Sequence, residues 1–256
     1  MRSLSLCMCL IMSLMVLAAC ASGSTPEPVD QSMLSGDRIT TENGDLIIQP
    51  IDHATFAMGW DGKTIYVDPV GGAEAFQDLP DPDLILITDI HGDHLNVETL
   101  EAVADENTVI VAPAAVVEQL PETLGSLVRT LDNGSEVSLL DLTVLAIPMY
   151  NLTEGRLQYH DNGRGNGYVV TLGGQRVYIS GDTEDIPEMR ALENIDVAFI
   201  CFNLPYTMTE EQAASAVLEF SPGIVYPYHY QGSDVDVFSA LVAENQDIEV
   251  RIGAWY

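Results

Sequence analysis

The residues best suited to chemistry lie in one short stretch, 88–94 (TDIHGDH), which follows the apolar run Leu84–Ile87. It contains the side chains of Asp89, His91, Asp93 and His94, although the whole chain has only five histidines. Carboxylates this close repel each other at neutral pH, and partial burial would add to that cost. A divalent cation reverses the balance, because carboxylate oxygens and neutral imidazole nitrogens are ligands that zinc, manganese and iron accept. The stretch therefore predicts a metal site; the alternative is a polar turn with exposed histidines.

The spacing within this stretch predicts how its side chains divide between ions. In an extended segment alternate side chains share a face, so Asp89 and His91 can bind one ion together. Asp93 and His94 diverge and can address a neighbouring position, as in clusters whose two ions lie about 3.5–4 Å apart. Further ligand-type residues stand in loops after other predicted strands: Tyr150-Asn151, His160, Asp182 and His229.

The elements that must position these residues change character along the chain. Residues 46–69 predict an antiparallel meander with a hairpin at Asp61-Gly62. Residues 84–120 alternate strand, loop and helix, with Asn96 as the expected N-cap of a helix to about residue 104. A second half repeats this order, and we expect strands at 197–201, 224–228 and 249–252 and helices at 186–192, 210–220 and 235–244. The sequence therefore predicts an α/β fold in which two sheets pack face to face with helices outside.

Composition limits the possible partners. The chain has 256 residues, 47% of them hydrophobic, which suits one domain with a sizeable core. Its 39 acidic residues outnumber 9 basic ones and give a formal net charge of -30. Such a surface repels nucleic acid and anionic lipid, so we expect a small-molecule substrate and no nucleic acid.

The N-terminal segment predicts export. Arg2 precedes an apolar stretch from Leu4 to Val16 that is too short to span a bilayer. The segment 17–20 (LAAC) resembles the lipobox of bacterial lipoprotein signal peptides, which implies cleavage before Cys20 and acylation of that cysteine. We therefore predict a signal peptide at 1–19, a flexible tether at 20–44 and a folded domain at 45–256. The alternative is an ordinary secretory signal with an incidental cysteine.

A lipidated Cys20 would anchor the exported protein to the cell envelope. In a Gram-negative cell we expect the outer membrane, because Ala21 is not the aspartate that marks inner-membrane retention in enteric bacteria. Cys7 and Cys9 would leave with the signal, so that Cys201 is the one free cysteine of the mature domain. Stability must then come from the core or from a metal.

A series of motifs in chain order resembles the metallo-β-lactamase-fold hydrolases, and most closely their L-ascorbate-6-phosphate lactonase-like branch. The motifs are DHATF (52–56), DP (68–69), TDIHGDH (88–94), IPMYN (147–151), GY (167–168), ISGDT (179–183), IDVA (195–198), YTM (206–208) and PYHY (227–230). The resemblance covers roughly residues 46–230 and includes all five histidines. It implies a four-layer αβ/βα sandwich with a metal site between the sheet edges.

The resemblance also implies a ligand set. The family motif is His-x-His-x-Asp-His, followed by a later histidine, a bridging aspartate after a glycine, and a final histidine. From it we expect six metal ligands: Asp89, His91, Asp93, His94, Asp182 and His229. Asp89 replaces the first histidine, and Asn151 stands near the middle one, for which His160 can substitute. A carboxylate at position 89 makes the site harder and more negative, which favours Mn²⁺ or Fe²⁺ more than an all-histidine site would, and leaves open whether one or two ions, Zn²⁺ among the candidates, bind.

The implied function is a metal-dependent hydrolase, lactonase- or phosphodiesterase-like, that uses a metal-bound hydroxide on an ester-type bond. The substrate would be a lactone, a phosphoester or an N-acyl compound. Asp93 would orient the hydroxide and relay its proton, and His160 or Tyr206 would donate to the developing oxyanion. For His160, a role as metal ligand or substrate contact and an exposed loop position both stay open. The competing hypothesis is a non-catalytic binding module on the envelope, with a site that is degenerating at Asp89 and Asn151.

Overall fold

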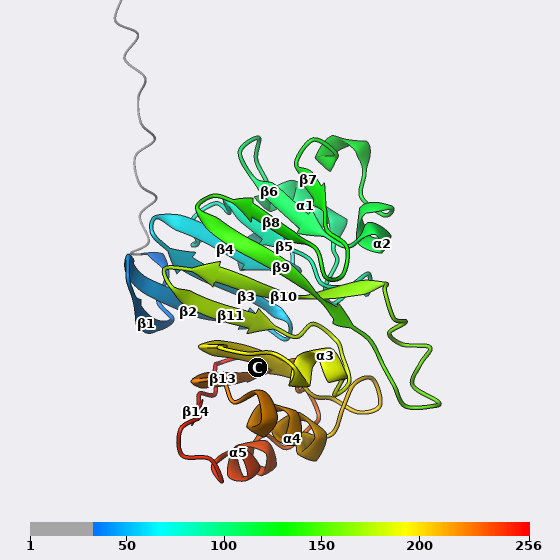
Figure 1. Ribbon diagram of the computed structural model, residues 1–256. Coiled ribbons are helices and arrows are strands. Elements are labelled where there is room, and N and C mark those ends of the chain that lie inside the picture. Colours follow the sequence, from blue (N-terminus) through cyan, green and yellow to red (C-terminus); the bar gives the residue numbers. More distant parts are fainter. Residues whose placement is uncertain (1–32) are drawn as a thin grey trace, which may run out of the picture.

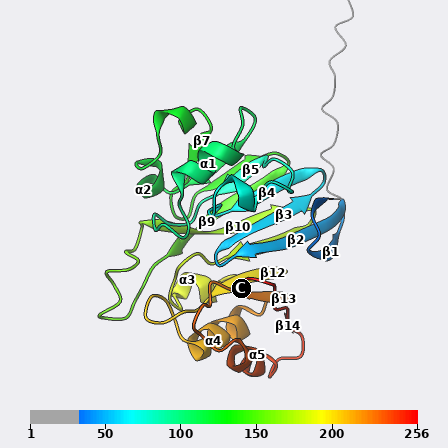
Figure 2. The ribbon, with the colours of Figure 1, turned by 180° about the vertical axis from the view of Figure 1, so that it is seen from behind.

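The computed structural model describes residues 33–256 and shows two seven-stranded sheets (Figures 1 and 2). The predicted signal peptide 1–19, Cys20 and residues 21–32 of the predicted tether lie outside the described residues. Within the described part of the chain, no helix has the length and apolar character that crossing a membrane requires.

The first half of the chain builds one sheet, in which neighbouring strands follow the chain order. The first four strands pair antiparallel and the later pairs, from β4 onward, are parallel. The strands are β1 (Asp37–Thr41), β2 (Gly44–Asp52), β3 (Thr55–Trp60), β4 (Lys63–Val67), β5 (Leu84–Leu86), β6 (Val109–Ala112) and β7 (Val128–Thr130). Helices α1 (Val97–Val103) and α2 (Ala114–Val117), with the 3₁₀ turns η2 (Ala73–Ala75) and η3 (Glu122–Leu124), connect its parallel part.

The second half repeats this topology in the other sheet. Strands β8 to β11 pair antiparallel, and β11 to β14 pair parallel. The strands are β8 (Glu136–Leu139), β9 (Leu142–Met149), β10 (Gly165–Leu172), β11 (Gln175–Ile179), β12 (Val197–Cys201), β13 (Ile224–Tyr228) and β14 (Glu249–Val250). Its helices are α3 (Pro187–Arg190), α4 (Glu210–Phe220) and α5 (Val235–Val242).

Alternating side chains explain the layers. In β3, which is buried along its whole length, Phe56 and Met58 belong to the core between the sheets. Ala57 faces the opposite way and packs in a second cluster with Leu100 of α1 and Val116 of α2. Helices α4 and α5 cover the outer face of the second sheet (Figure 1). The result is the predicted sandwich of helices, two sheets and helices.

Most predicted elements are confirmed, and two expectations are corrected. The 210–220 helix has the predicted bounds because Thr209 and Gln212 form a capping box at its start. The boundary of the folded domain at residue 45 is wrong, since Leu34 is buried and β1 pairs along β2 within the predicted tether 20–44. Polar residues of an edge strand look like a linker in sequence. Strand β7 was also not predicted, because its three residues are too few to show a pattern.

Parallel strands bring the motifs together, because their carboxyl ends meet at one edge of each sheet. Asp68 follows β4, and the stretch 88–94 follows β5 in the first sheet. In the second sheet, Asp182 follows β11 and His229 follows β13. The two edges face each other where the candidate site lies.

We expect Phe56→Ala to lower the free energy of unfolding by about 3–5 kcal/mol, because it opens a cavity between the sheets. The Phe56 ring is fully buried and stacks on Phe199 across that core, with ring centroids 4.3 Å apart. Urea unfolding measures the change. The control Val237→Ala, on the exposed side of α5, should change it by less than about 0.5 kcal/mol. Equal effects of the two substitutions would contradict this account of the core.

Candidate metal centre

The structure brings every predicted site residue to one cavity of about 400 Å³ or directly behind it. The stretch 88–94, the loop between β9 and β10, and the turns after β11 and β13 all contribute. His91, Asp93, His160, Asp182 and His229 line the cavity, and His53 joins them from the β2–β3 turn. His94 lies behind the cavity and is fully buried. All five histidines of the chain therefore converge here.

The buried carboxylate of Asp182 lies at the centre of three imidazoles. Its Oδ2 is 3.2 Å from His94 Nε2 and 3.3 Å from His160 Nε2. Its Oδ1 is 3.3 Å from His229 Nε2. This single carboxylate thus touches ligand candidates from three separate loops, as the predicted bridging position requires.

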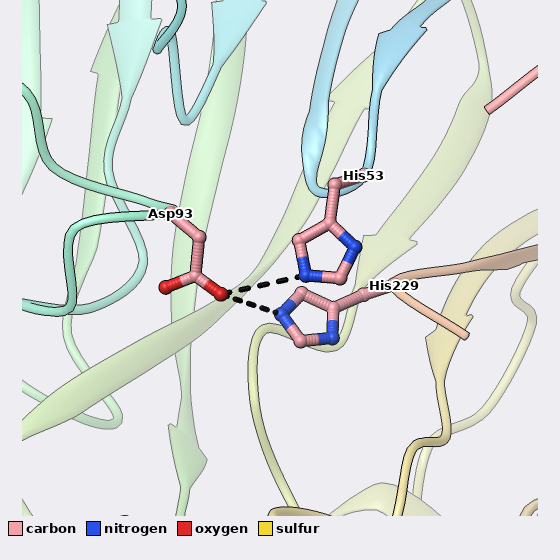
Figure 3. Close-up of side chains that lie close together, drawn as sticks. All are labelled: His53, Asp93 and His229. Carbon is pink, nitrogen blue, oxygen red and sulfur yellow. Dashed lines mark hydrogen bonds and ion pairs between the residues drawn. The ribbon is translucent and has the colours of Figure 1, made fainter. Parts of the chain in front are cut away.

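Asp93 faces a second pair of rings (Figure 3). Its Oδ2 lies 3.3 Å from His229 Nε2 and 3.4 Å from His53 Nε2. The His53 and His229 rings pack with centroids 3.8 Å apart, and the Tyr256 hydroxyl lies 2.8 Å from His53 Nδ1. The Asp93 side chain is 46% exposed, so it can reach both the ligand cluster and a molecule in the cavity.

Asp89, His91 and His160 form the third group. Oδ2 of Asp89 is 2.8 Å from His91 Nδ1, and the ligand atoms of all three residues lie within 4.8 Å of one another. Asp89 is fully buried and also accepts two hydrogen bonds from Arg164. The sequence did not single out Arg164, although a buried aspartate needs a cationic partner.

Two buried polar residues, Asp68 and Thr88, orient His94 from behind. His94 donates from Nδ1 to Asp68 Oδ2 at 2.8 Å, and Asp68 also accepts hydrogen bonds from the Thr88 amide and hydroxyl. This arrangement fixes the tautomer of His94 and turns Nε2 toward Asp182. The motif at 68–69 was noticed in the sequence, but this role was not predicted.

Asn151 has a structural role and does not take the place of the middle histidine. Its side-chain amide donates to the carbonyls of Arg156 and Tyr206, which ties two loops together. Its Oδ1 lies 3.4 Å from His160 Nδ1. His160 is buried and directs Nε2 to Asp182, so the open alternative of an exposed loop position is wrong.

The buried polar atoms fit a bound cation. His94 Nε2 and Asp182 Oδ1, which lie among the ligand candidates, are buried and have no hydrogen-bond partner. Three groups, two of which share His229, have ligand atoms close enough to hold an ion: His53–Asp93–His229, Asp89–His91–His160 and His94–Asp182–His229. Nitrogen and carboxylate oxygen atoms in these numbers suit zinc, manganese or iron. The residues present therefore fit the divalent metal that the sequence predicted.

The pKa shifts of His94, Asp182 and Asp93 also indicate that the site favours positive charge. Burial alone would lower the pKa of His94, but the carboxylates of Asp182 and Asp68 raise it well above its usual value. Burial would raise the pKa of Asp182, yet His229 and His94 hold it well below its usual value. For Asp93, burial is again outweighed by hydrogen bonds from His229 and His53, which lower the pKa. The carboxylates are therefore ionised at neutral pH and ready to bind a cation.

Known proteins match the chain over most of its length. A family model described as a beta-lactamase superfamily domain matches residues 47–229. A UPF0173 metal-dependent hydrolase of Pyrococcus abyssi is 27% identical over 215 residues, covering 78% of this chain and 93% of that protein.

Two solved structures resemble this chain. One, from Parabacteroides distasonis and provisionally named a metal-dependent hydrolase, is 40% identical with a TM-score of 0.80, covering 87% of this chain and 100% of that one. The metallo hydrolase Igni18 of Ignicoccus hospitalis is 23% identical with a TM-score of 0.67, covering 81% and 94% respectively, and supports the fold alone.

We expect Asp68→Asn to weaken divalent metal binding about 10–100-fold, because His94 loses the carboxylate that orients it. Competition with a chromophoric chelator measures the affinity for Mn²⁺ and Zn²⁺. Asp105→Asn is the matched control, since Asp105 caps a local turn away from the cavity. Equal affinities in the two variants would rule out a supporting role for Asp68.

Proposed function

The chain belongs to the metallo-β-lactamase superfamily of metal-dependent hydrolases, and we propose that it hydrolyses an ester-type bond in a small neutral molecule. The observation that carries the proposal is the convergence of Asp182 and three imidazoles at one open cavity, with Asp182 Oδ1 and His94 Nε2 buried and without a hydrogen-bond partner. A divalent ion in such a site lowers the pKa of water toward neutrality and polarises the oxygen of the scissile bond.

Three residues at the cavity have separate roles in the proposed hydrolysis. Asp93 is ionised, half exposed and turned to the cavity, so it can orient the attacking water and accept its proton. His160 fits a metal ligand better than the oxyanion donor proposed for it, because Nδ1 is turned to Asn151 and Nε2 faces Asp182. Tyr206 lines the cavity with a half-exposed ring and is the better placed hydroxyl donor.

The cavity favours an uncharged substrate. Among the described residues, none that lines it is a lysine or an arginine. The arginines of the neighbouring loop are already paired, Arg156 with Glu184 and Arg164 with Asp89. A phosphoester would therefore meet no guanidinium or ammonium group, whereas a carbonyl needs none.

Two tyrosine rings beside the cavity favour a substrate with flat or apolar groups. Tyr159 and Tyr206 meet edge to face, with ring centroids 5.1 Å apart, on one side of the cavity. Aromatic rings bind flat or apolar groups well. Among the candidates from the sequence, a lactone or an N-acyl compound with apolar groups fits these rings better than a phosphoester.

A substrate screen tests the proposal. With Mn²⁺ or Zn²⁺ added, we expect hydrolysis of lactones or N-acyl compounds with apolar groups, and at least 10-fold slower cleavage of bis-para-nitrophenyl phosphate. His91→Ala and Asp182→Ala should lower kcat/KM by more than about 100-fold, because each removes a ligand candidate. Val237→Ala, far from the cavity, should keep full activity. Metal binding without any hydrolysis would favour the non-catalytic binding module, and unchanged rates in Asp182→Ala would overturn the site assignment.

We further propose that the protein is an envelope lipoprotein anchored through Cys20, on the support of the lipobox-like segment 17–20. Expressed in a bacterial host, the wild type should fractionate with membranes and incorporate labelled palmitate. Cys20→Ser should abolish both, because the acylated thiol is lost. An unlabelled wild type, or a Cys20→Ser protein that stays in the membrane fraction with label, would show that Cys20 is not the anchor.

A further inference from the structure

Asp89 is held more tightly than an ordinary metal ligand. Arg164 donates from Nε to Oδ1 at 3.1 Å and from Nη2 to Oδ2 at 2.8 Å. The guanidinium is itself fixed by the Tyr159 carbonyl, which accepts from Nη2 at 2.5 Å. The Asp89 side chain is fully buried and that of Arg164 is 16% exposed. Such a bidentate pair leaves the carboxylate a single orientation.

The two hydrogen bonds from Arg164 leave one side of the Asp89 carboxylate available to a metal ion. A carboxylate offers about four lone-pair positions, and Arg164 uses one on each oxygen. The second position on Oδ2 is directed to His91, whose Nδ1 lies 2.8 Å away. His160 completes this group. Asp89 can therefore offer Oδ2 to an ion between these side chains while Arg164 keeps both hydrogen bonds.

The Arg164–Asp89 pair also determines the net charge at position 89. The family motif that the sequence resembles has a histidine at the position of Asp89. Asp89 paired with Arg164 carries no net charge, like a neutral imidazole, and the pairing offsets the negative charge expected there from the sequence. Removing the guanidinium of Arg164 alone would leave the buried Asp89 carboxylate without its cationic partner.

We propose that Arg164 is a positioning residue that makes Asp89 a neutral, one-oxygen ligand, so that Asp89, His91 and His160 form a working metal subsite beside the one around Asp182. The proposal rests on the metal dependence of the proposed function but not on its substrate. The opposite possibility is that Arg164 withdraws Asp89 from any ion and leaves this subsite with two imidazoles.

The metal content of the purified protein distinguishes a working Asp89 subsite from one in which Arg164 withdraws Asp89. Purified protein is loaded with Mn²⁺ or Zn²⁺, dialysed and analysed for metal, and affinities are measured by chelator competition. The wild type should hold two ions. Asp89→Asn and Arg164→Met should each weaken one ion about 10–100-fold and leave the other unchanged. Arg164→Lys should weaken the same ion, because lysine keeps the charge and loses the fork. The double variant Asp89→His with Arg164→Met should restore two ions, since a neutral imidazole replaces a neutral pair.

Arg156→Met is the matched control. Arg156 lies on the same loop and pairs with buried Glu184 at 2.9 Å, outside the three ligand groups. It should keep both ions, and thermal unfolding confirms that each variant is folded. A second readout is the visible absorption of Co²⁺-loaded protein, which should lose the contribution of one ion in Arg164→Met and regain it in the double variant.

Unchanged or tighter binding in Arg164→Met, or a double variant that holds one ion more than the wild type, would overturn the proposal. A wild type that holds two ions but hydrolyses nothing would overturn the proposed function and leave this inference standing.

Discussion

The metal centre depends on hydrogen bonds made on the outer side of its imidazole rings. His94 is turned by Nδ1 to Asp68, and His160 by Nδ1 to Asn151. Each Nε2 is thereby turned to Oδ2 of Asp182, at 3.2 and 3.3 Å. A positive charge is needed between these groups: either a proton on His94, whose pKa the carboxylates raise well above its usual value, or a divalent ion that binds the neutral rings. The groups behind the rings therefore determine that the space in front binds positive charge.

The same centre connects the two halves of the fold. The first sheet supplies His53 and the stretch 88–94, whereas the second supplies His160, Asp182 and His229. Cys201 is the one cysteine among the described residues, so that no disulfide joins the halves there. A cation shared by ligands from both sheets binds the folded state and stabilises it in proportion to its affinity. A cation bound there would therefore hold the two sheets together as well as take part in chemistry between them.

The sequence predicted the fold and the convergence of the ligand candidates because both depend on local patterns. Alternating apolar residues mark the strands, and the ligand candidates stand directly after them, so Asp89, His91, His94, Asp182 and His229 could be found by position. Partners from distant segments could not. Asp68 reaches His94 across 26 residues, and Arg164 reaches Asp89 across 75. Such contacts depend on the register of strands and the course of the β9–β10 loop, which side-chain patterns do not determine.

That loop explains why two departures from the family motif occur together. It provides His160, whose Nε2 lies 3.3 Å from Asp182 Oδ2, and Arg164, which pairs with Asp89. Asn151 in turn faces His160 through Oδ1 and binds the loop through the Arg156 carbonyl. A degenerating site would leave a buried carboxylate and a displaced histidine without partners, at a cost in stability. Here each departure has its own compensating residue on one segment. These partners support the proposal that Asp89 belongs to a rebuilt ligand set, over the hypothesis of a degenerating site.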